Sequence, residues 1–142
     1  MERKWVDSFV STGKIVYDPN RGDMKKRTKW WCVVDVDREI TRYFRYWVKR
    51  ELWIDLHKPA WDAHISVIRG EQPSPAHLHL WKKYHGQKVP FEYSLHVKQP
   101  LESDKDHFWY VSVNCPFLDN LRTELGLKTG WTHHLTIGRT YS

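Results

Sequence analysis

The sequence predicts one α+β domain made of two similar halves. Apolar residues alternate with polar ones in several strand-like stretches, apolar residues recur at helical spacing in others, and a strand–helix–strand order occurs twice. The chain has 142 residues, which suits a single domain spanning 1–142. Hydrophobic residues make up 40% and charged residues 28% of it, so a disordered chain is excluded.

The first 29 residues are expected to form an irregular N-terminal arm. Gly13, Pro19 and Gly22 interrupt this segment, and only residues 14–17 suggest a short strand. The arm also holds a basic run at 25–29. Regular structure is therefore expected to begin near residue 30.

The first half is expected to cover about residues 30–69. Residues 30–36 alternate as in a strand, and Asp37 then suits the N-cap of an amphipathic helix. The apolar positions of that helix are Ile40, Phe44, Trp47, Val48 and Leu52. Residues 62–69 alternate again, with Ala63, Ile65 and Val67 on the apolar side, and predict a second strand.

The second half is expected to cover about residues 93–139. A helix beginning at Ser74-Pro75 and ending at Gly86 connects the halves, and strands follow at 91–98 and 108–114. Pro116 begins a short helix, and a closing strand is expected at 133–138. The predicted architecture is two-lobed and pseudo-symmetric, with antiparallel sheets lining a central groove and helices outside.

Charge and composition limit the setting in which the protein works. Lysine and arginine number 23 against 17 acidic residues, a net charge of +6 that favours phosphate-bearing partners. Cys32 and Cys115 lie among apolar neighbours and are expected to be reduced core residues. No apolar run approaches the roughly 20 residues of a membrane span, and the first residues do not resemble a secretory signal. A cytoplasmic protein without a membrane partner is expected.

Two short motifs occupy matching places in the two halves. They are His64-Ile65-Ser66 and His134-Leu135-Thr136, each a histidine, an aliphatic residue and a small hydroxyl on a predicted strand. Because side chains alternate across a strand, the aliphatic residue points to the core while the imidazole and the hydroxyl project together from the other face. If a pseudo-twofold axis relates the halves, two imidazoles and two hydroxyls converge on one groove.

Phosphodiester cleavage needs this set of groups. One imidazole can accept a proton from the attacking hydroxyl or water while the other, protonated, donates one to the departing oxygen. The Ser66 and Thr136 hydroxyls can hydrogen-bond the non-bridging oxygens as negative charge builds up. This chemistry requires no metal and no cofactor. His77 and His79, two apart on a predicted helix, point in different directions and do not suggest a metal site.

The motif pair, with the duplicated order of strands and helices, resembles the 2H phosphoesterase (LigT-like) superfamily. The resemblance covers about residues 30–139. The segments WDAHISVIRGE at 61–71, LWKKYHG at 80–86 and HLTIGR at 134–139 look most like the phage anti-CBASS phosphodiesterases, where CBASS is a cyclic-oligonucleotide antiphage system. The resemblance implies that His64 and His134 are the catalytic histidines and that Ser66 and Thr136 are their hydroxyl partners.

The resemblance also implies a function. It implies a metal-independent phosphodiesterase that hydrolyses 3′,5′-linked cyclic di- or trinucleotide messengers, such as 3′,3′-cGAMP, in the cytoplasm of an infected bacterium. The cyclic oligonucleotide is then the partner, and no stable complex with a nucleic acid is expected. The sequence indicates neither which histidine is the acid nor the oligomeric state.

Nucleotide substrates need aromatic platforms for bases and cations for phosphates. By strand parity, Trp31 and Tyr110 share the face of the histidines, and Tyr17 in the basic arm is a third candidate for stacking. Arg69 and Arg139 follow their motifs at the same spacing and are candidates for binding phosphate at the groove rim.

Two other functions fit the same residues. One is a phosphodiesterase that acts on RNA ends, opening 2′,3′-cyclic phosphates or cleaving 2′,5′ linkages. The other, of a different class, is a non-catalytic protein that sequesters cyclic nucleotides. An open basic track would favour RNA ends, and a compact pocket would favour a cyclic dinucleotide.

Overall fold

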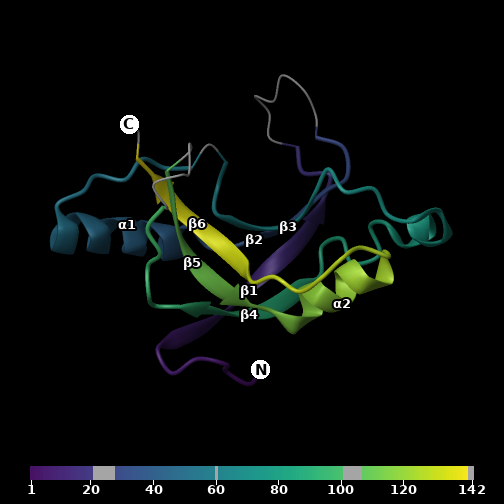
Figure 1. The fold of residues 1–142 in the computed structure, drawn as a ribbon, viewed down its shortest axis with the longest axis horizontal. Helices are drawn as coiled ribbons and strands as arrows, with labels where there is room; N and C mark the ends of the chain where they lie inside the picture. Colours follow the sequence, from purple (N-terminus) through teal and green to yellow (C-terminus); the bar gives the residue numbers. More distant parts are fainter. Residues whose placement is uncertain (21–27, 60, 101–106, 141–142) are drawn as a thin grey trace.

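Six antiparallel strands close into a barrel with the neighbour order β1-β2-β3-β6-β5-β4 (Figure 1). This computed structural model describes residues 1–20, 28–59, 61–100 and 107–140. The strands are β1 (Ser8–Tyr17), β2 (Trp31–Asp35), β3 (His64–Arg69), β4 (Lys88–Ser94), β5 (Phe108–Asn114) and β6 (His133–Arg139). The helices are α1 (Arg38–Leu52), the 3-10 helix η1 (Pro75–Leu80) and α2 (Pro116–Glu124).

The two halves of the chain have the same order of elements. Each consists of two strands, a helix and a third strand, so that β1-β2-α1-β3 is followed by β4-β5-α2-β6. The third strands of the two halves, β3 and β6, are neighbours, and so are the first strands, β1 and β4. The duplicated order is present, but the halves share one closed barrel instead of forming two lobes with separate sheets.

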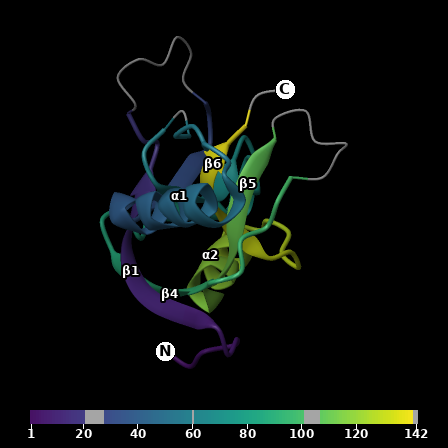
Figure 2. The ribbon, with the colours of Figure 1, turned by 90° about the vertical axis from the view of Figure 1, so that its left-hand side faces the viewer.

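The helices lie on opposite sides of the strands (Figure 1). Figure 2 looks onto the side where α1 lies and shows this helix across the strands, with β1, β4, β5 and β6 around it. Asp37 is the N-cap of α1 and accepts a hydrogen bond from the Glu39 amide at 2.9 Å, as expected. Phe44 and Val48 turn into the same core as Ile65 and Leu135. No helix in the described part of the chain is both long and apolar enough to cross a bilayer.

The prediction of an irregular arm over 1–29 is wrong for residues 8–13, whereas the short strand expected at 14–17 is confirmed as the second part of β1. This strand pairs along its length with β4 and, in its second half, with β2. Its sequence hides it because the polar Ser8 is buried while Phe9 and Val10 are exposed. Gly13 lets β2 approach closely, since a Cβ there would lie 2.8 Å from the Asp35 carbonyl oxygen and would also strike the Val34 side chain.

The expected helix over 74–86 is also only partly correct. It is a 3-10 helix that ends at Leu80, and turns carry the chain to Gly86, whose φ is +84°. None of the residues described in η1 is buried, so no apolar stripe holds a longer helix against the core. Cys32 and Cys115, both among the described residues, are buried and free, as expected.

Candidate functional site

The two histidine motifs lie side by side on β3 and β6. Ile65 pairs directly with Leu135 in antiparallel register, and both side chains are 0% exposed. Continuing this register by one residue in each direction places His64 opposite Thr136 and Ser66 opposite His134. The two motifs are therefore related to one another by a pseudo-twofold axis through the Ile65–Leu135 pair.

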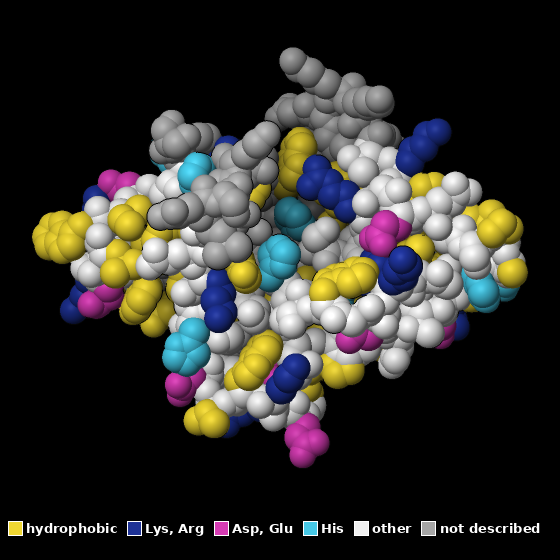
Figure 3. All heavy atoms as spheres, viewed as in Figure 1, with side chains coloured by type: hydrophobic (Ala, Val, Ile, Leu, Met, Phe, Trp, Pro, Cys, Tyr) yellow, Lys and Arg dark blue, Asp and Glu magenta, His cyan; other side chains and the backbone are white. Residues whose placement is uncertain are grey.

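The four polar side chains of the motifs share the outer surface of the barrel. Since Ile65 and Leu135 point into the core, strand alternation turns the residues on either side of them outward. The α-carbons of the diagonal neighbours His64 and His134 are then roughly 7–8 Å apart, so that both side chains border the same part of this surface. Figure 3 shows histidine side chains close together in a hollow over β3 and β6, with lysine or arginine beside them.

A β-bulge follows the hydroxyl residue in each motif. In β3, Ser66 pairs with Val33 and Ile68 with Cys32, so Val67 is an extra residue. In β6, Thr136 pairs with Tyr110 and Gly138 with Trp109, so Ile137 is the extra residue. An extra residue reverses the alternation that follows it. Arg69 and Arg139 thereby return to the surface that carries the histidines.

Each of these two arginines lies over an aromatic ring on the neighbouring strand, β2 for Arg69 and β5 for Arg139. The Arg69 guanidinium is 5.9 Å from the centre of the Trp31 ring. The Arg139 guanidinium is 5.2 Å from the centre of the Phe108 ring. We call the outer face that carries His64, Ser66, His134 and Thr136 the histidine surface. Because β3 and β6 are antiparallel, the two guanidinium groups lie at opposite ends of it.

Two further arginines, from the helices, hold the bulges. Arg122 of α2 donates through Nη1 to the Val67 carbonyl oxygen at 2.8 Å, and Arg45 of α1 donates through Nη1 to the Ile137 carbonyl oxygen, also at 2.8 Å. Each helix thus supports the motif strand of the other half. Arg122 is 0% exposed and also forms a bidentate pair with Glu71 at 2.8 and 2.6 Å.

The His64 ring is held by the backbone. Its Nδ1 lies 2.7 Å from the Asp62 carbonyl oxygen. Because a carbonyl oxygen only accepts, Nδ1 carries a proton, and Nε2 is the basic nitrogen of the neutral ring. Asp35 pairs with His64 across β2 and β3, which places a carboxylate beside this histidine.

His134 has a different environment. Its ring lies 4.9 Å from the Tyr110 ring, centre to centre, and Ser112 is its partner on β5. Partial removal of the ring from water lowers the pKa of His134 from its usual 6.5, and the charge of His133 lowers it further. His133 itself points inward, as its strand parity predicts, and its Nε2 lies 3.3 Å from Asp119 Oδ1.

The predicted base platforms are only partly available. Tyr110 is half-buried on the histidine surface, opposite Thr136. Trp31 shares that surface but is 2% exposed beneath Arg69 and beside Trp61, so its ring is not an open platform. The expectation for Tyr17 is wrong: it is a β1 residue that is 2% exposed, and its ring packs in the core against Trp81.

Sequence reasoning missed the bulges and the helical arginines that hold them. The sequence did indicate the bulges, because two small or apolar residues follow each hydroxyl, Val67-Ile68 after the first motif and Ile137-Gly138 after the second. A strictly alternating strand does not place two such residues next to each other. Arg45 and Arg122 had no signal, since arginines on amphipathic helices are usually exposed to solvent.

Comparison of the chain with protein-family models, curated proteins and solved structures found no match in any of the three. The case for a function of this surface therefore depends on its side-chain arrangement and on the two motifs themselves.

Proposed function

We propose that the protein is a metal-independent phosphodiesterase with a 2H phosphoesterase-like site at His64, Ser66, His134 and Thr136. The observation that supports this is the antiparallel pairing of the two motifs about Ile65 and Leu135. It surrounds one space with two imidazoles and two hydroxyls. A phosphodiester presents two ester oxygens and two non-bridging oxygens, and the four groups match these in number and in approximate symmetry.

The environments of the two histidines suggest different roles. His134, with its lowered pKa, is neutral at pH 7 and suits the general base. It accepts the proton of the attacking water or ribose hydroxyl as the new phosphorus–oxygen bond forms. His64, whose Nδ1–H is held by the Asp62 carbonyl oxygen and which lies beside Asp35, suits the general acid: its imidazolium form donates the Nε2 proton to the ester oxygen that leaves. One proton is accepted and one is donated in each turnover, so the proton count balances. Before the next turnover, His134 releases its proton to water and His64 takes one up.

The hydroxyls and arginines suit the negative charge that develops on phosphorus. Ser66 and Thr136 stand opposite the histidine of the other motif, within reach of the non-bridging oxygens. Arg69 and Arg139 suit phosphates on either side of the scissile one. A cyclic trinucleotide has two further phosphates, one for each arginine, and a cyclic dinucleotide has one, which either arginine can bind.

The preferred substrate class is therefore the 3′,5′-linked cyclic di- and trinucleotides, of which 3′,3′-cGAMP is an example. The sequence resemblance to phage anti-CBASS enzymes points the same way. On this proposal the protein acts in the bacterial cytoplasm and removes the messenger before it activates an antiphage effector.

The test is direct product analysis. The purified protein is incubated, with a chelator present, with 3′,3′-cGAMP, cyclic di-AMP, a cyclic trinucleotide and an RNA ending in a 2′,3′-cyclic phosphate, and the products are separated by chromatography. Cleavage of the cyclic oligonucleotides that persists with the chelator is expected. If only the RNA end is cleaved, the substrate is an RNA end and not a cyclic oligonucleotide. If the cyclic oligonucleotides bind tightly and are not cleaved, the protein sequesters them and is not an enzyme.

A further inference from the structure

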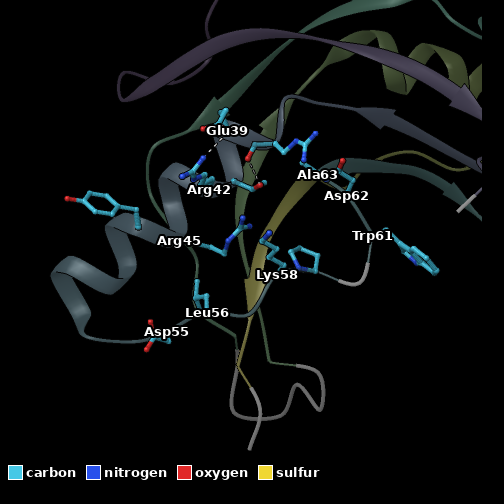
Figure 4. A pocket seen from close by; sticks show the side chains of 13 residues that line it. Glu39, Arg42, Arg45, Asp55, Leu56, Lys58, Trp61, Asp62 and Ala63 are labelled. Atoms are coloured by element: carbon cyan, nitrogen blue, oxygen red, sulfur yellow. Dashed lines mark hydrogen bonds and ion pairs between the residues drawn. The ribbon is translucent and has the colours of Figure 1, made fainter. Parts of the chain in front are cut away.

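A cavity of about 780 Å³ lies between α1 and the segment that leads into β3. Figure 4 shows Arg45 reaching into this space from α1 and Lys58 from the opposite side. Among the described residues, no side chain of either histidine motif lines the cavity, although Asp62 and Ala63 in its wall directly precede His64. The cavity is therefore next to the histidine surface but separate from it.

Positive charge dominates the cavity once its existing ion pairs are counted. Four cations line it, Arg38, Arg42, Arg45 and Lys58, against three acids, Glu39, Asp55 and Asp62. Arg42 pairs with Glu39 at 3.3 Å, and Lys49, from outside the lining, pairs with Asp55 at 2.6 Å. Within the described part of the chain, Arg38 and Lys58 form no ion pair. Asp62 is then the one remaining acid of the described lining, and Arg38, Arg45 and Lys58 outnumber it.

Arg45 is fixed at the wall of the cavity. One of its nitrogens donates to the Ile137 carbonyl oxygen at 2.8 Å, and the side chain is half-buried. Burial first, and then the nearby charge of Arg42, lower the pKa of Arg45, and the Asp62 carboxylate only partly offsets them. A cation that is partly withdrawn from water and close to another cation is stabilised by an anion placed between them.

Apart from Thr41, the rest of the described lining is apolar or aromatic. Leu56, Pro59 and Trp61 are half-buried along the wall formed by the segment before β3. The volume is in the range of pockets that hold small organic ligands. An inorganic anion would leave most of it unfilled.

We infer that this cavity binds a small organic phosphate of nucleotide size, with its phosphate near Arg38, Arg45 and Lys58 and its ring against the apolar wall of Leu56 and Pro59. The inference does not depend on catalysis at the histidine surface, because none of its ligand contacts uses a motif residue. Arginine and lysine side chains are the usual partners of a phosphate dianion.

The test is a calorimetric titration of the full chain with adenosine monophosphate, with adenosine and inorganic phosphate as matched probes. Adenosine monophosphate is expected to bind more tightly than either probe. The double variant Arg38→Gln/Lys58→Gln should weaken that binding by at least about tenfold, since charge-assisted contacts are lost. The variant Arg50→Gln, at an exposed arginine that pairs with Glu51, should change nothing.

A second pair of variants separates this cavity from the histidine surface. In His64→Ala and His134→Ala, the affinity for adenosine monophosphate should stay within about twofold of wild type if the cavity is the site. Affinity lost in either histidine variant and kept in Arg38→Gln/Lys58→Gln would overturn the inference. So would equal affinity for adenosine and adenosine monophosphate, or no binding at millimolar concentration. Circular dichroism confirms that each variant is folded.

Discussion

Arg122 on α2 donates a hydrogen bond of 2.8 Å to the carbonyl oxygen of Val67, the bulge residue of β3. The same guanidinium pairs with Glu71 beyond the end of this strand. One buried cation from the second half of the chain thus fixes the bulge that turns Arg69 toward the histidines. Arg45 has the equivalent contact with Ile137 in the other half.

Arg122→Met should lower the free energy of unfolding by about 2–4 kcal/mol, because it leaves the Val67 carbonyl and the Glu71 carboxylate without their donor. Urea unfolding followed by circular dichroism measures the change. Arg42→Met is the matched control, since its ion pair with Glu39 is exposed and should contribute less than about 0.5 kcal/mol. Equal effects of the two variants would mean that Arg122 has no special structural role.

His64→Ala and His134→Ala should each lower kcat on the cleaved cyclic oligonucleotide by about 10²- to 10⁴-fold, with KM changed only a few-fold, because each removes a proton-transfer group and little binding surface. Steady-state kinetics measures both constants. His96→Ala is the control, since His96 pairs with Asp7 at an exposed site. Near-wild-type rates in both motif variants would refute the assignment of acid and base.

Ser66→Ala and Thr136→Val should each lower kcat by about 10- to 100-fold, as expected for one hydrogen bond to a developing negative charge. The folded state should be unaffected, because Ser66 is exposed and Thr136 is half-buried. The comparison variant is Ser112→Ala, which changes a hydroxyl beside His134 that no motif contains. If KM rises while kcat is unchanged, the hydroxyl contributes equally to binding of the substrate and of the transition state, and does not stabilise the transition state selectively.

The pH dependence of kcat/KM should reveal the environment of His134. If this histidine is the base, activity rises as His134 loses its proton, so the acidic limb should have its midpoint below 6.5, the usual pKa of an imidazole. Tyr110→Ala should rehydrate the ring and move this midpoint upward toward 6.5. If the wild-type midpoint lies at or above 6.5, or if Tyr110→Ala does not shift it, a group other than His134 is the base.

Acid stability should depend on Glu92. Burial raises the pKa of this carboxyl, but hydrogen bonds from Ser8, the Lys4 and Trp5 amides and Asn114 outweigh burial and hold the pKa at about 2.

A lowered carboxyl pKa contributes stability that is complete above the unfolded value, near 4.5, and is lost as the pH falls toward 2. Urea unfolding between these pH values should show this loss. Glu92→Gln should be less stable at pH 7 and should vary less with pH over this range. An unchanged pH dependence in the variant would exclude Glu92 as the titrating group.

Several elements could be predicted from the sequence because their patterns are local. Asp37 capping α1, β5 over Phe108–Asn114, and Pro116 at the start of α2 depend on neighbours within a few residues. The outward direction of His64 and Ser66, and of His134 and Thr136, also follows from alternation alone. β1 was missed because its burial is set by β2 and β4, which lie far away in the sequence.

The two motifs, the faces of their strands and the duplicated order of elements could be read from the amino-acid sequence. The neighbouring positions of β3 and β6, the pairing of Ile65 with Leu135, and the burial of Tyr17 and Trp31 arise only in the folded barrel. The difference is the distance along the chain over which each feature is set. Alternation and helical spacing are fixed by bonds between adjacent residues, whereas strand order, bulges and the contacts of Arg45 and Arg122 arise only when the barrel closes.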